Sequence, residues 1–215
     1  MANKAILAGA SGLIGSALLE ILLQQPDYDE VVVLVRNLLP VKHPKLNQVQ
    51  INFNALNNYS SYITGHALFC CLGSTRKKTP DFRDYTKVDF EYPLQLAEMA
   101  LTNGVEQYHL VSALGANKDA ANFYLKLKGS TEEAIKKVGL PALFIYQPSF
   151  LTGERKEKRG GEKIFISLMK YINPLLRGTF KKYRSIAAKS VAEAMYKNSL
   201  KKQLGVFIYP SDKII

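Results

Sequence analysis

The sequence predicts an α/β fold with a doubly wound parallel sheet, and three observations carry this prediction. A glycine-rich turn joins an apolar run to a helical pattern near the amino terminus. Strand and helix patterns then alternate along the chain, and polar or glycine residues recur where the strands end. At 215 residues the chain can form one such domain. We expect a core over residues 1–150 and a small segment, residues 151–215, packed on the same domain.

The first strand leads into a turn that suits a phosphate. Lys4 to Ala10 reads as a strand and Leu13 to Gln24 as a helix, joined by Gly9-Ala-Ser-Gly12-Leu-Ile-Gly15. Glycine tolerates the dihedral angles of a tight strand-to-helix turn and lets backbone N–H groups approach a pyrophosphate. Gly15 leaves room where the helix presses on the sheet. Because many glycine-rich turns are only structural, the prediction depends on the residues that follow.

The second strand ends in a basic residue. The run Asp29-Glu-Val-Val-Val-Leu-Val-Arg36 is rich in β-branched residues, as in strands buried on both faces, and we expect a strand over Val31–Arg36. Arg36 follows Gly15 by 21 residues, where NAD-specific domains place an acidic residue on the adenosine ribose. An arginine there suits a 2′-phosphate, so we expect NADP, with NADPH preferred over NADH. The alternative is a solvated arginine at a strand end.

The remaining elements complete a Rossmann pattern, in which ligands bind outside the carboxyl ends of the strands. Cofactor or substrate residues are therefore expected after each strand, at Gly9–Gly15, Arg36, Gly73, Ser112 and Pro148. The expected elements are strands Val49–Phe53, Ala67–Leu72, Gln107–Ser112, Ala142–Pro148 and Gly205–Tyr209, and helices from about Tyr85 to Gly104, Asn122–Val138 and Ser190–Leu200.

Tyr124 and Lys128 are the candidate catalytic pair. At i and i+4 of a helical pattern they share one helix face, and the ammonium stabilises a phenolate, which suits the phenol for acid–base work near neutral pH. Ser112, at the end of the preceding strand, is expected to orient a substrate carbonyl. Tyr209 and Lys213 form a second pair at this spacing, but only the first follows a strand-end serine. The alternative is a packed tyrosine ring beside a solvated lysine.

Taken together, these motifs resemble an atypical short-chain dehydrogenase/reductase, a family of NAD(P)-binding Rossmann proteins. The likeness is to the human Tat-interacting protein group and its small bacterial relatives, and it runs from about Lys4 to Pro148. It rests on the glycine turn, Arg36, Phe69-Cys-Cys-Leu-Gly-Ser-Thr-Arg76, Ser112-Ala-Leu-Gly-Ala116, Tyr124-Leu-Lys-Leu-Lys128 and Gln147-Pro-Ser149. The resemblance implies an NADP-binding oxidoreductase with a Ser/Tyr/Lys catalytic set.

From the motifs and the resemblance together we expect the cofactor to contact a ring of residues at the strand ends. These are Gly9, Ser11, Gly12, Leu13, Ile14, Gly15, Arg36, Phe53, Leu72, Gly73, Ser74, Val111, Tyr124, Lys128, Pro148, Ser149 and Phe150. The chain departs from the family pattern at three places, with Asn52-Phe53 for Asp-Phe, Ser112-Ala113 for Ser-Ser and Gln147-Pro-Ser for Arg-Pro-Gly.

The net charge of +11 is concentrated near the carboxyl end. Residues 1–150 hold 14 Lys/Arg against 13 Asp/Glu, and residues 151–215 hold 15 against 5. A candidate lid, the apolar stretch 164–176 between basic clusters, suggests an anionic substrate, or contact of 154–184 with a protein or membrane surface. No nucleic-acid motif accompanies these bases, and we expect a monomer or homodimer.

Other features exclude several classes of protein. No apolar run of 18 or more residues is present, and the first apolar stretch is broken by Gly and Ser, so we expect a cytoplasmic protein. The adjacent Cys70 and Cys71 read as reduced packing residues. His43, His66 and His109 are expected in surface or loop positions without a metal.

Three hypotheses about function follow. The first is an NADP-dependent oxidoreductase acting on a small carbonyl or alcohol. The second is a regulatory protein that binds NADP(H) without catalysis, suggested by Ala113. The third is an epimerase or reductase of the nucleotide-sugar type on the same fold.

Overall fold

The computed structural model describes residues 3–75, 79–153, 176 and 178–214. In these residues seven strands form one parallel sheet in the order β3-β2-β1-β4-β5-β6-β9. The strands are β1 Lys4–Ala8, β2 Glu30–Val35, β3 Leu46–Gln50, β4 Ala67–Cys70, β5 Gln107–Val111, β6 Ala142–Gln147 and β9 Gly205–Pro210. The order reverses between β1 and β4, so the predicted doubly wound sheet is confirmed.

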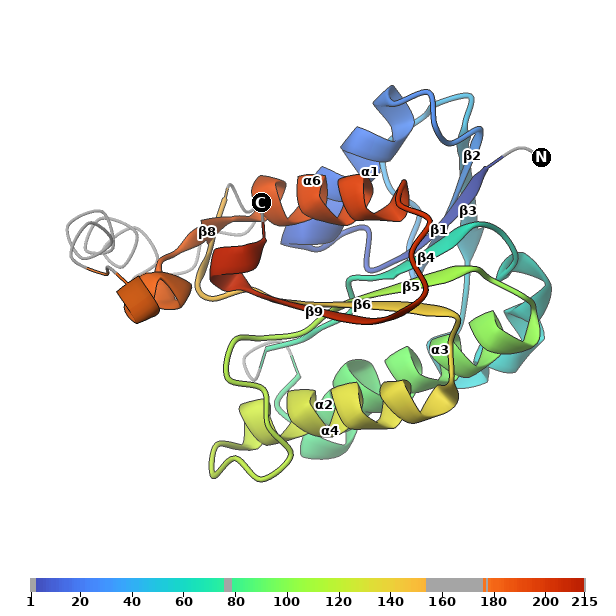
Figure 1. Ribbon diagram of the computed structural model, residues 1–215. Coiled ribbons are helices and arrows are strands. Elements are labelled where there is room, and N and C mark those ends of the chain that lie inside the picture. The colour runs from blue at the N-terminus through green and yellow to red at the C-terminus, as the bar shows by residue number, and fades with distance from the viewer. Residues whose placement is uncertain (1–2, 76–78, 154–175, 177, 215) are drawn as a thin grey trace.

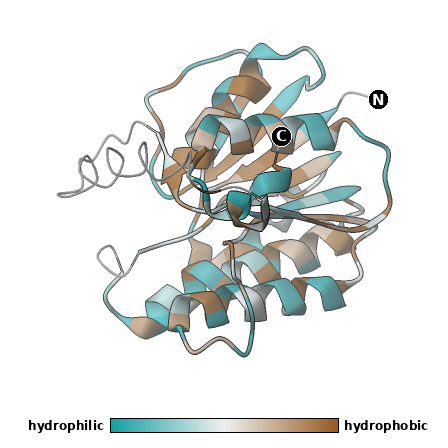
Figure 2. Ribbon diagram, turned by 60° about the vertical axis from the view of Figure 1, so that its left-hand side comes forward, coloured by the Kyte–Doolittle hydropathy of each residue, from teal (hydrophilic) through white to brown (hydrophobic). Residues whose placement is uncertain are grey.

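Helices cover both faces of this sheet (Figure 1). On one face lie α1 (Leu13–Gln24) and α6 (Ala188–Ser199). The other face carries α2 (Phe82–Thr86), a π-helical turn (Lys87–Glu91), α3 (Tyr92–Thr102) and α4 (Phe123–Val138). Figure 2 shows hydrophobic residues along the strands, between helices whose outer sides carry much hydrophilic colour. Two apolar clusters, one on each face, therefore make up the core.

Local signals at the helix ends explain where these helices begin and stop. The Asn122 side chain accepts a hydrogen bond from the Leu125 N–H and caps α4, and Gly139 ends it in the left-handed conformation with φ 83°. The Asp81 side chain accepts from the Arg83 N–H and starts α2 three residues earlier than the sequence suggested. The expected helix of about 85–104 is instead α2, a π-helical turn and α3 in succession.

The third strand differs from its prediction. We expected Val49–Phe53, whereas β3 spans Leu46–Gln50 and Phe53 begins a 3-10 helix, Phe53–Tyr62. The Asn52 side chain accepts a hydrogen bond from the Asn54 N–H, which turns the chain before Phe53.

The carboxy-terminal segment joins the main core. Strand β9 pairs with β6 along its whole length, and α6 packs on α1 with Val191 and Met195 fully buried. A small parallel pair, β7 (Leu151–Thr152) and β8 (Ile186–Ala187), follows β6, and short 3-10 turns span Gly178–Tyr183 and Ser211–Lys213. The candidate lid over 164–176 lies outside the described residues except for Leu176.

Candidate functional site

The glycine turn between β1 and α1 is packed so closely that side chains are excluded. A Cβ atom on Gly15 would lie 2.1 Å from the Gly9 carbonyl oxygen, and one on Gly9 would lie 2.5 Å from the Cys71 carbonyl oxygen. Gly9 also has φ 89°, and its oxygen accepts a hydrogen bond of 2.9 Å from the Gly12 N–H. The contact that needs Gly15 is thus with the turn itself, at the end of β1.

The first turn of α1 is open to an anion. Gly12 is the N-cap residue, and no side chain caps the helix there. The first turn contains no acidic residue, and Ser11 and Gly12 are exposed. The positive end of the α1 dipole and its backbone N–H groups therefore lie at the switch point between β1 and β4, where a phosphate cradle is expected. Leu13 is partly buried, while Ile14 and Gly15 lie in the core and offer only backbone atoms.

Arg36 and Phe53 follow β2 and β3 at the same edge of the sheet. The Arg36 side chain is exposed, while its carbonyl oxygen accepts a hydrogen bond from Gln50 Nε2. Phe53 is buried, with its ring centroid 5.3 Å from that of Tyr92. Arg36 is thus available to a bound phosphate, whereas Phe53 contributes mainly to packing at this edge.

Lys128 forms a buried ion pair that the sequence did not indicate. Its ammonium lies 2.9 Å from Asp89 Oδ1, with side-chain exposures of 5% and 0%. Burial lowers the pKa of Lys128, but the charge and hydrogen bond of Asp89 together with the nearby Tyr124 raise the pKa above the ordinary value. Tyr124 lies in the first turn of the same helix, one turn before this charge, and is 38% exposed. The pair therefore combines an accessible phenol with a permanently charged amine.

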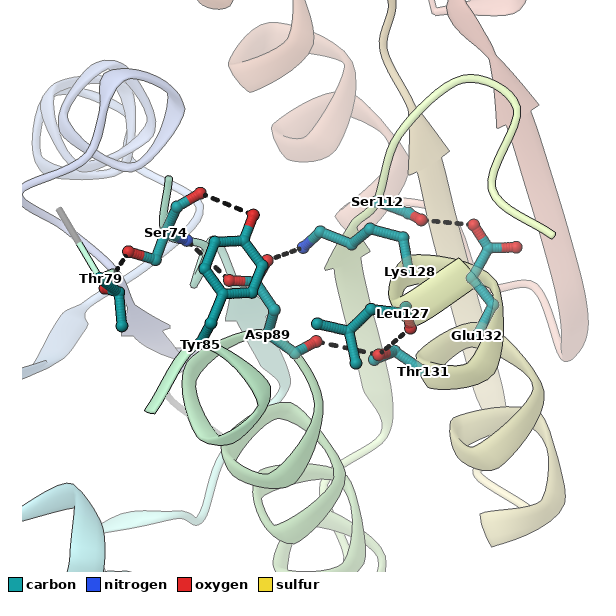
Figure 3. Close-up of polar contacts among 9 residues, drawn as sticks. All are labelled: Ser74, Thr79, Tyr85, Asp89, Ser112, Leu127, Lys128, Thr131 and Glu132. Atoms are coloured by element: carbon teal, nitrogen blue, oxygen red, sulfur yellow. Dashed lines mark hydrogen bonds and ion pairs between the residues drawn. The ribbon is translucent and has the colours of Figure 1, made fainter. Parts of the chain in front are cut away.

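Asp89 also fixes the loop that follows β4 (Figure 3). It lies in the π-helical turn, a feature frequent at functional sites. Its Oδ2 accepts a hydrogen bond of 2.8 Å from the Ser74 N–H. A Cβ on Gly73 would lie 3.5 Å from Asp89 Oδ1 and 3.7 Å from Lys128 Nζ. The exposed Gly73 backbone therefore lies directly over the ion pair.

Ser112 points to a different partner from the one expected. Its hydroxyl donates to Glu132 Oε1, and the residue is 4% exposed. Gln147 Nε2 donates to both Glu132 oxygens at 3.0 Å. Burial raises the pKa of Glu132, opposed by these hydrogen bonds. Figure 3 shows Ser112 turned toward Glu132, and Lys128 reaching the other way toward Asp89. The structure thus brings Tyr124 and Lys128 together but engages Ser112 elsewhere, so its carbonyl-orienting role stays a prediction.

The other residues predicted to contact the cofactor lie along the same edge of the sheet and differ in how far they are exposed. Leu72, Ser74 and Val111 are partly buried after β4 or at the end of β5, and Pro148 is buried after β6. The Ser149 hydroxyl donates to the Arg184 carbonyl and accepts from Ser211 at 3.0 Å, which ties it to the carboxy-terminal segment. Phe150 is 57% exposed.

Asp89 and Glu132 are the two site residues that sequence reasoning missed. Both are acidic residues on the inner face of a helix, and both are at most 4% exposed. The sequence does contain a sign of each buried acid. Asp89 stands between the apolar residues Val88 and Phe90, and Glu132 follows Lys128 by one helical turn. Their partners, however, come from other elements.

The histidines differ in part from their prediction. His109 lies in the centre of β5, 0% exposed, stacked between Phe69 and Phe144 at centroid distances of 4.7 and 4.5 Å. Burial lowers its pKa to about 3, and its ring nitrogens contact Tyr146 and Gln107. The surface-or-loop expectation is therefore wrong for His109, because β5 runs through the middle of the sheet.

Metal ligands and membrane spans can be assessed only in residues 3–75, 79–153, 176 and 178–214. This part of the chain contains no group of three or more His, Cys, Asp or Glu side chains placed to hold a metal ion. No helix in it has the length and apolar character needed to cross a bilayer. Cys70 and Cys71 are free thiols.

The residues present fit a nicotinamide dinucleotide. The strand-to-helix turn is as tight as the dinucleotide fingerprint requires, because a Cβ on Gly9, Gly12 or Gly15 would lie within 3.2 Å of a backbone oxygen of the protein. The β4 loop also holds a buried hydroxyl oxygen, Thr75 Oγ1, without a hydrogen-bond partner among the described residues. Phosphate-binding backbone, an accessible arginine and a Tyr–Lys pair thus occupy one edge of the sheet.

Comparison with known proteins agrees with this geometry. A model of the family described as NAD(P)H-binding matches residues 9–202. Protein HTATIP2 of Rattus norvegicus is 34% identical over 167 residues, which cover 75% of this chain and 69% of that protein. The mitochondrial protein FMP52 of Kluyveromyces lactis is 30% identical over 208 residues, covering 96% and 84%.

The fold recurs in a solved enzyme that contains the dinucleotide. The structure of WbmH from Bordetella bronchiseptica in complex with NAD+ superposes with a TM-score of 0.73 at 17% identity, covering 98% of this chain and 76% of that one. At this identity the likeness supports the fold alone.

Proposed function

The chain belongs to the NAD(P)H-binding family, and from that membership we propose that it is an NADP-dependent oxidoreductase acting on a small carbonyl or alcohol substrate. One observation carries the proposal: Tyr124, which is 38% exposed, stands one helical turn from a buried lysine paired with a carboxylate. Both lie on α4, at the edge of the sheet where the glycine cradle opens. A domain with only a structural role does not require an exposed tyrosine one turn from a buried, charged lysine.

The cradle and the β4 loop hold the cofactor in this proposal. Backbone N–H groups at the start of α1 bind the pyrophosphate, and Arg36 binds the 2′-phosphate. Gly73 and Leu72 would line the nicotinamide half, since Gly73 is exposed and adjoins the Asp89–Lys128 ion pair. When bound, the cofactor supplies or accepts a hydride.

Side chains of the protein transfer the proton in this proposal. In the direction of reduction the Tyr124 hydroxyl donates its proton to the carbonyl oxygen as the carbonyl carbon receives the hydride, so the product is an alcohol. Lys128 stabilises the phenolate left on Tyr124, which then regains a proton from solvent. Asp89 keeps the ammonium at 2.9 Å and charged.

The test is turnover of NADPH with a panel of small aldehydes and ketones. Tyr124→Phe removes only the hydroxyl and is expected to lower kcat about 100-fold or more. Tyr209→Phe is the matched control, since Tyr209 also precedes a lysine by four residues but lies in strand β9, stacked on Tyr146. Full activity of Tyr124→Phe on a genuine substrate would rule out this mechanism.

A second candidate function is NADP(H) binding for regulation without catalysis. The favouring observation is that the Ser112 hydroxyl is engaged by Glu132 and the next residue is Ala113. Cofactor binding without turnover of any carbonyl, together with partner binding that differs between NADP+ and NADPH, would favour this second function. We also propose a cytoplasmic location and a role in substrate or partner contact for residues 154–184; residues 154–175 and 177 lie outside the described residues.

A further inference from the structure

Strand β9 has an open side to its backbone. It ends the strand order of the sheet and pairs, in the described residues, with β6 alone. The Gly205 N–H donates to the Pro141 carbonyl at 2.8 Å, on the side of β6. Because backbone groups alternate between the two sides of a strand, those of Val206 and Ile208 point to the outer side. Pro210, which has no N–H, takes the next outward position.

The side chains along this edge are apolar and exposed. Leu204, Val206 and Ile208 are 80%, 50% and 44% exposed. Phe207 and Tyr209, which alternate with them, stack on rings of β6 at the other face of the sheet. No charged residue stands between Leu204 and Tyr209. An uncharged, apolar edge strand of this kind is a template for pairing with another strand.

The opposite edge of the same sheet has a different character. Strand β3 carries Asn47, Gln48 and Gln50 among its five residues, and Asn47 and Gln50 are exposed. A polar edge gains little from a partner strand, whereas an apolar edge gains burial of its side chains. The difference points to pairing at the β9 edge and to solvent at the β3 edge.

The occupant that fits this edge is the same strand from a second copy of the chain. Two-fold symmetry brings one surface of two subunits together, so a single strand is its own partner. In antiparallel order, Val206 of one subunit faces Ile208 of the partner subunit. Both residues present outward N–H and carbonyl groups, so each such pair exchanges two hydrogen bonds. Their apolar side chains then meet on the same face of the joined sheet.

The charges that flank β9 favour the antiparallel order. Lys201 and Lys202 precede the strand, whereas Asp212 and Lys213 follow it. One flank therefore carries two positive charges and the other has no net charge. Antiparallel order places a positive flank beside a neutral one, but parallel order would place the two positive flanks together.

We propose that the chain forms a homodimer in which the β9 edges of two copies pair in antiparallel order. The two seven-stranded sheets then continue into one. Antiparallel pairing puts the carboxyl ends of the two sheets at opposite ends of the dimer, so the inference does not rest on the proposed function. A contact centred on a six-residue strand is small for a specific interface, so we expect a dissociation constant of roughly micromolar size.

The test is sedimentation equilibrium of the full chain at concentrations on both sides of about 10 μM. The ionic strength is held at about 0.15 M, because each copy carries a net charge of +11 that must be screened. The wild type should pass from monomer to dimer as its concentration rises. Val206→Lys brings like charges together across the joint and should weaken dimerisation at least about tenfold. The matched control is Leu101→Lys, the introduction of the same charge at a 40% exposed leucine of α3, which should change nothing.

A backbone variant tests the hydrogen bonds themselves. Ile208→Pro removes an outward N–H and no bond to β6, so the monomer should keep its fold while the dimer weakens at least about tenfold. The urea midpoint at a concentration where the wild type is monomeric checks the fold of each variant. Val206→Lys changes a half-exposed side chain and keeps the backbone intact, so the two variants test the edge independently.

The possible outcomes are distinct. A wild type that stays monomeric throughout the concentration range would overturn the proposal. So would a dimer that withstands both Val206→Lys and Ile208→Pro, or one that Leu101→Lys disrupts, because its interface would then lie on another surface. Dissociation by the two β9 variants alone would support pairing through this edge.

Discussion

The ammonium of Lys128 lies 2.9 Å from the carboxylate of Asp89, and both side chains are almost completely shielded from water. This ion pair joins α4 to the π-helical turn before α3. Asp89 also accepts a hydrogen bond from the Ser74 N–H in the loop after β4. The Thr131 hydroxyl adds a bond of 2.9 Å to the Asp89 carbonyl. Helix α4 and the loop after β4 are therefore connected through one carboxylate.

Removing one member of this pair should be more harmful than removing both charges. Lys128→Met leaves a buried carboxylate without its counter-ion, and we expect a loss of about 3–5 kcal/mol in the free energy of unfolding. Asp89→Asn/Lys128→Met keeps an acceptor for the Ser74 N–H and leaves no charge, so it should recover most of that loss. Urea unfolding of both variants measures the difference, and a double variant no more stable than Lys128→Met would contradict the pairing.

The close contact at Gly15 predicts a strong effect of a single methyl group. Gly15→Ala places a Cβ 2.1 Å from the Gly9 oxygen, a backbone atom that cannot move aside easily. We expect the unfolding free energy to fall by about 3 kcal/mol, although alanine favours helices. Gly139→Ala is the control, because nothing lies within 4 Å of its Cβ and only its φ of 83° is unfavourable. Its loss should be about 1–2 kcal/mol, and equal losses for both would argue against the steric explanation.

Arg36 should distinguish the two nicotinamide cofactors. Its exposed guanidinium at the end of β2 suits the 2′-phosphate, which NADH lacks. Arg36→Ala is expected to weaken NADPH binding about tenfold or more and to leave NADH binding nearly unchanged. Fluorescence titrations at one fixed ionic strength measure both affinities. If both cofactors lost affinity equally, Arg36 would be acting through the fold and not through a phosphate.

His109 predicts a specific loss of stability in acid. Burial lowers its pKa to about 3, from an unfolded value near 6.5, so the unfolded chain binds the proton first. The stability that His109 contributes is complete above pH 6.5 and is lost as the pH falls from 6.5 toward 3. At pH 5 the loss is about 2 kcal/mol.

The matched variant for this pH effect is His109→Gln, which keeps polar contacts but does not titrate. Unfolding free energies of wild type and variant, measured from pH 7.5 to about pH 5, should converge as the pH falls. Parallel curves would show that other groups cause the acid dependence.

The sequence by itself determined the order of the elements and the cradle. Signals within a few neighbouring residues predicted the strands of the parallel sheet and helix α1 over Leu13–Gln24. They also predicted helix α4 with its Asn122 cap and its end at Gly139. Hydrophobic periodicity and turn chemistry are local properties, so one strand or one helix suffices to express them. The binding of a nicotinamide cofactor followed from the same local pattern.

Only the tertiary structure decided which side chains meet. Lys128 pairs with Asp89 and Ser112 with Glu132, and His109 becomes a buried neutral ring, because helices and strands distant in the sequence cross at these points. Strand β9 likewise finds its place beside β6 only through long-range pairing. The physical reason is that charge, burial and hydrogen bonding at a site depend on what packs against each residue from another element. The local pattern gives each residue a position on its element, and packing gives it a partner.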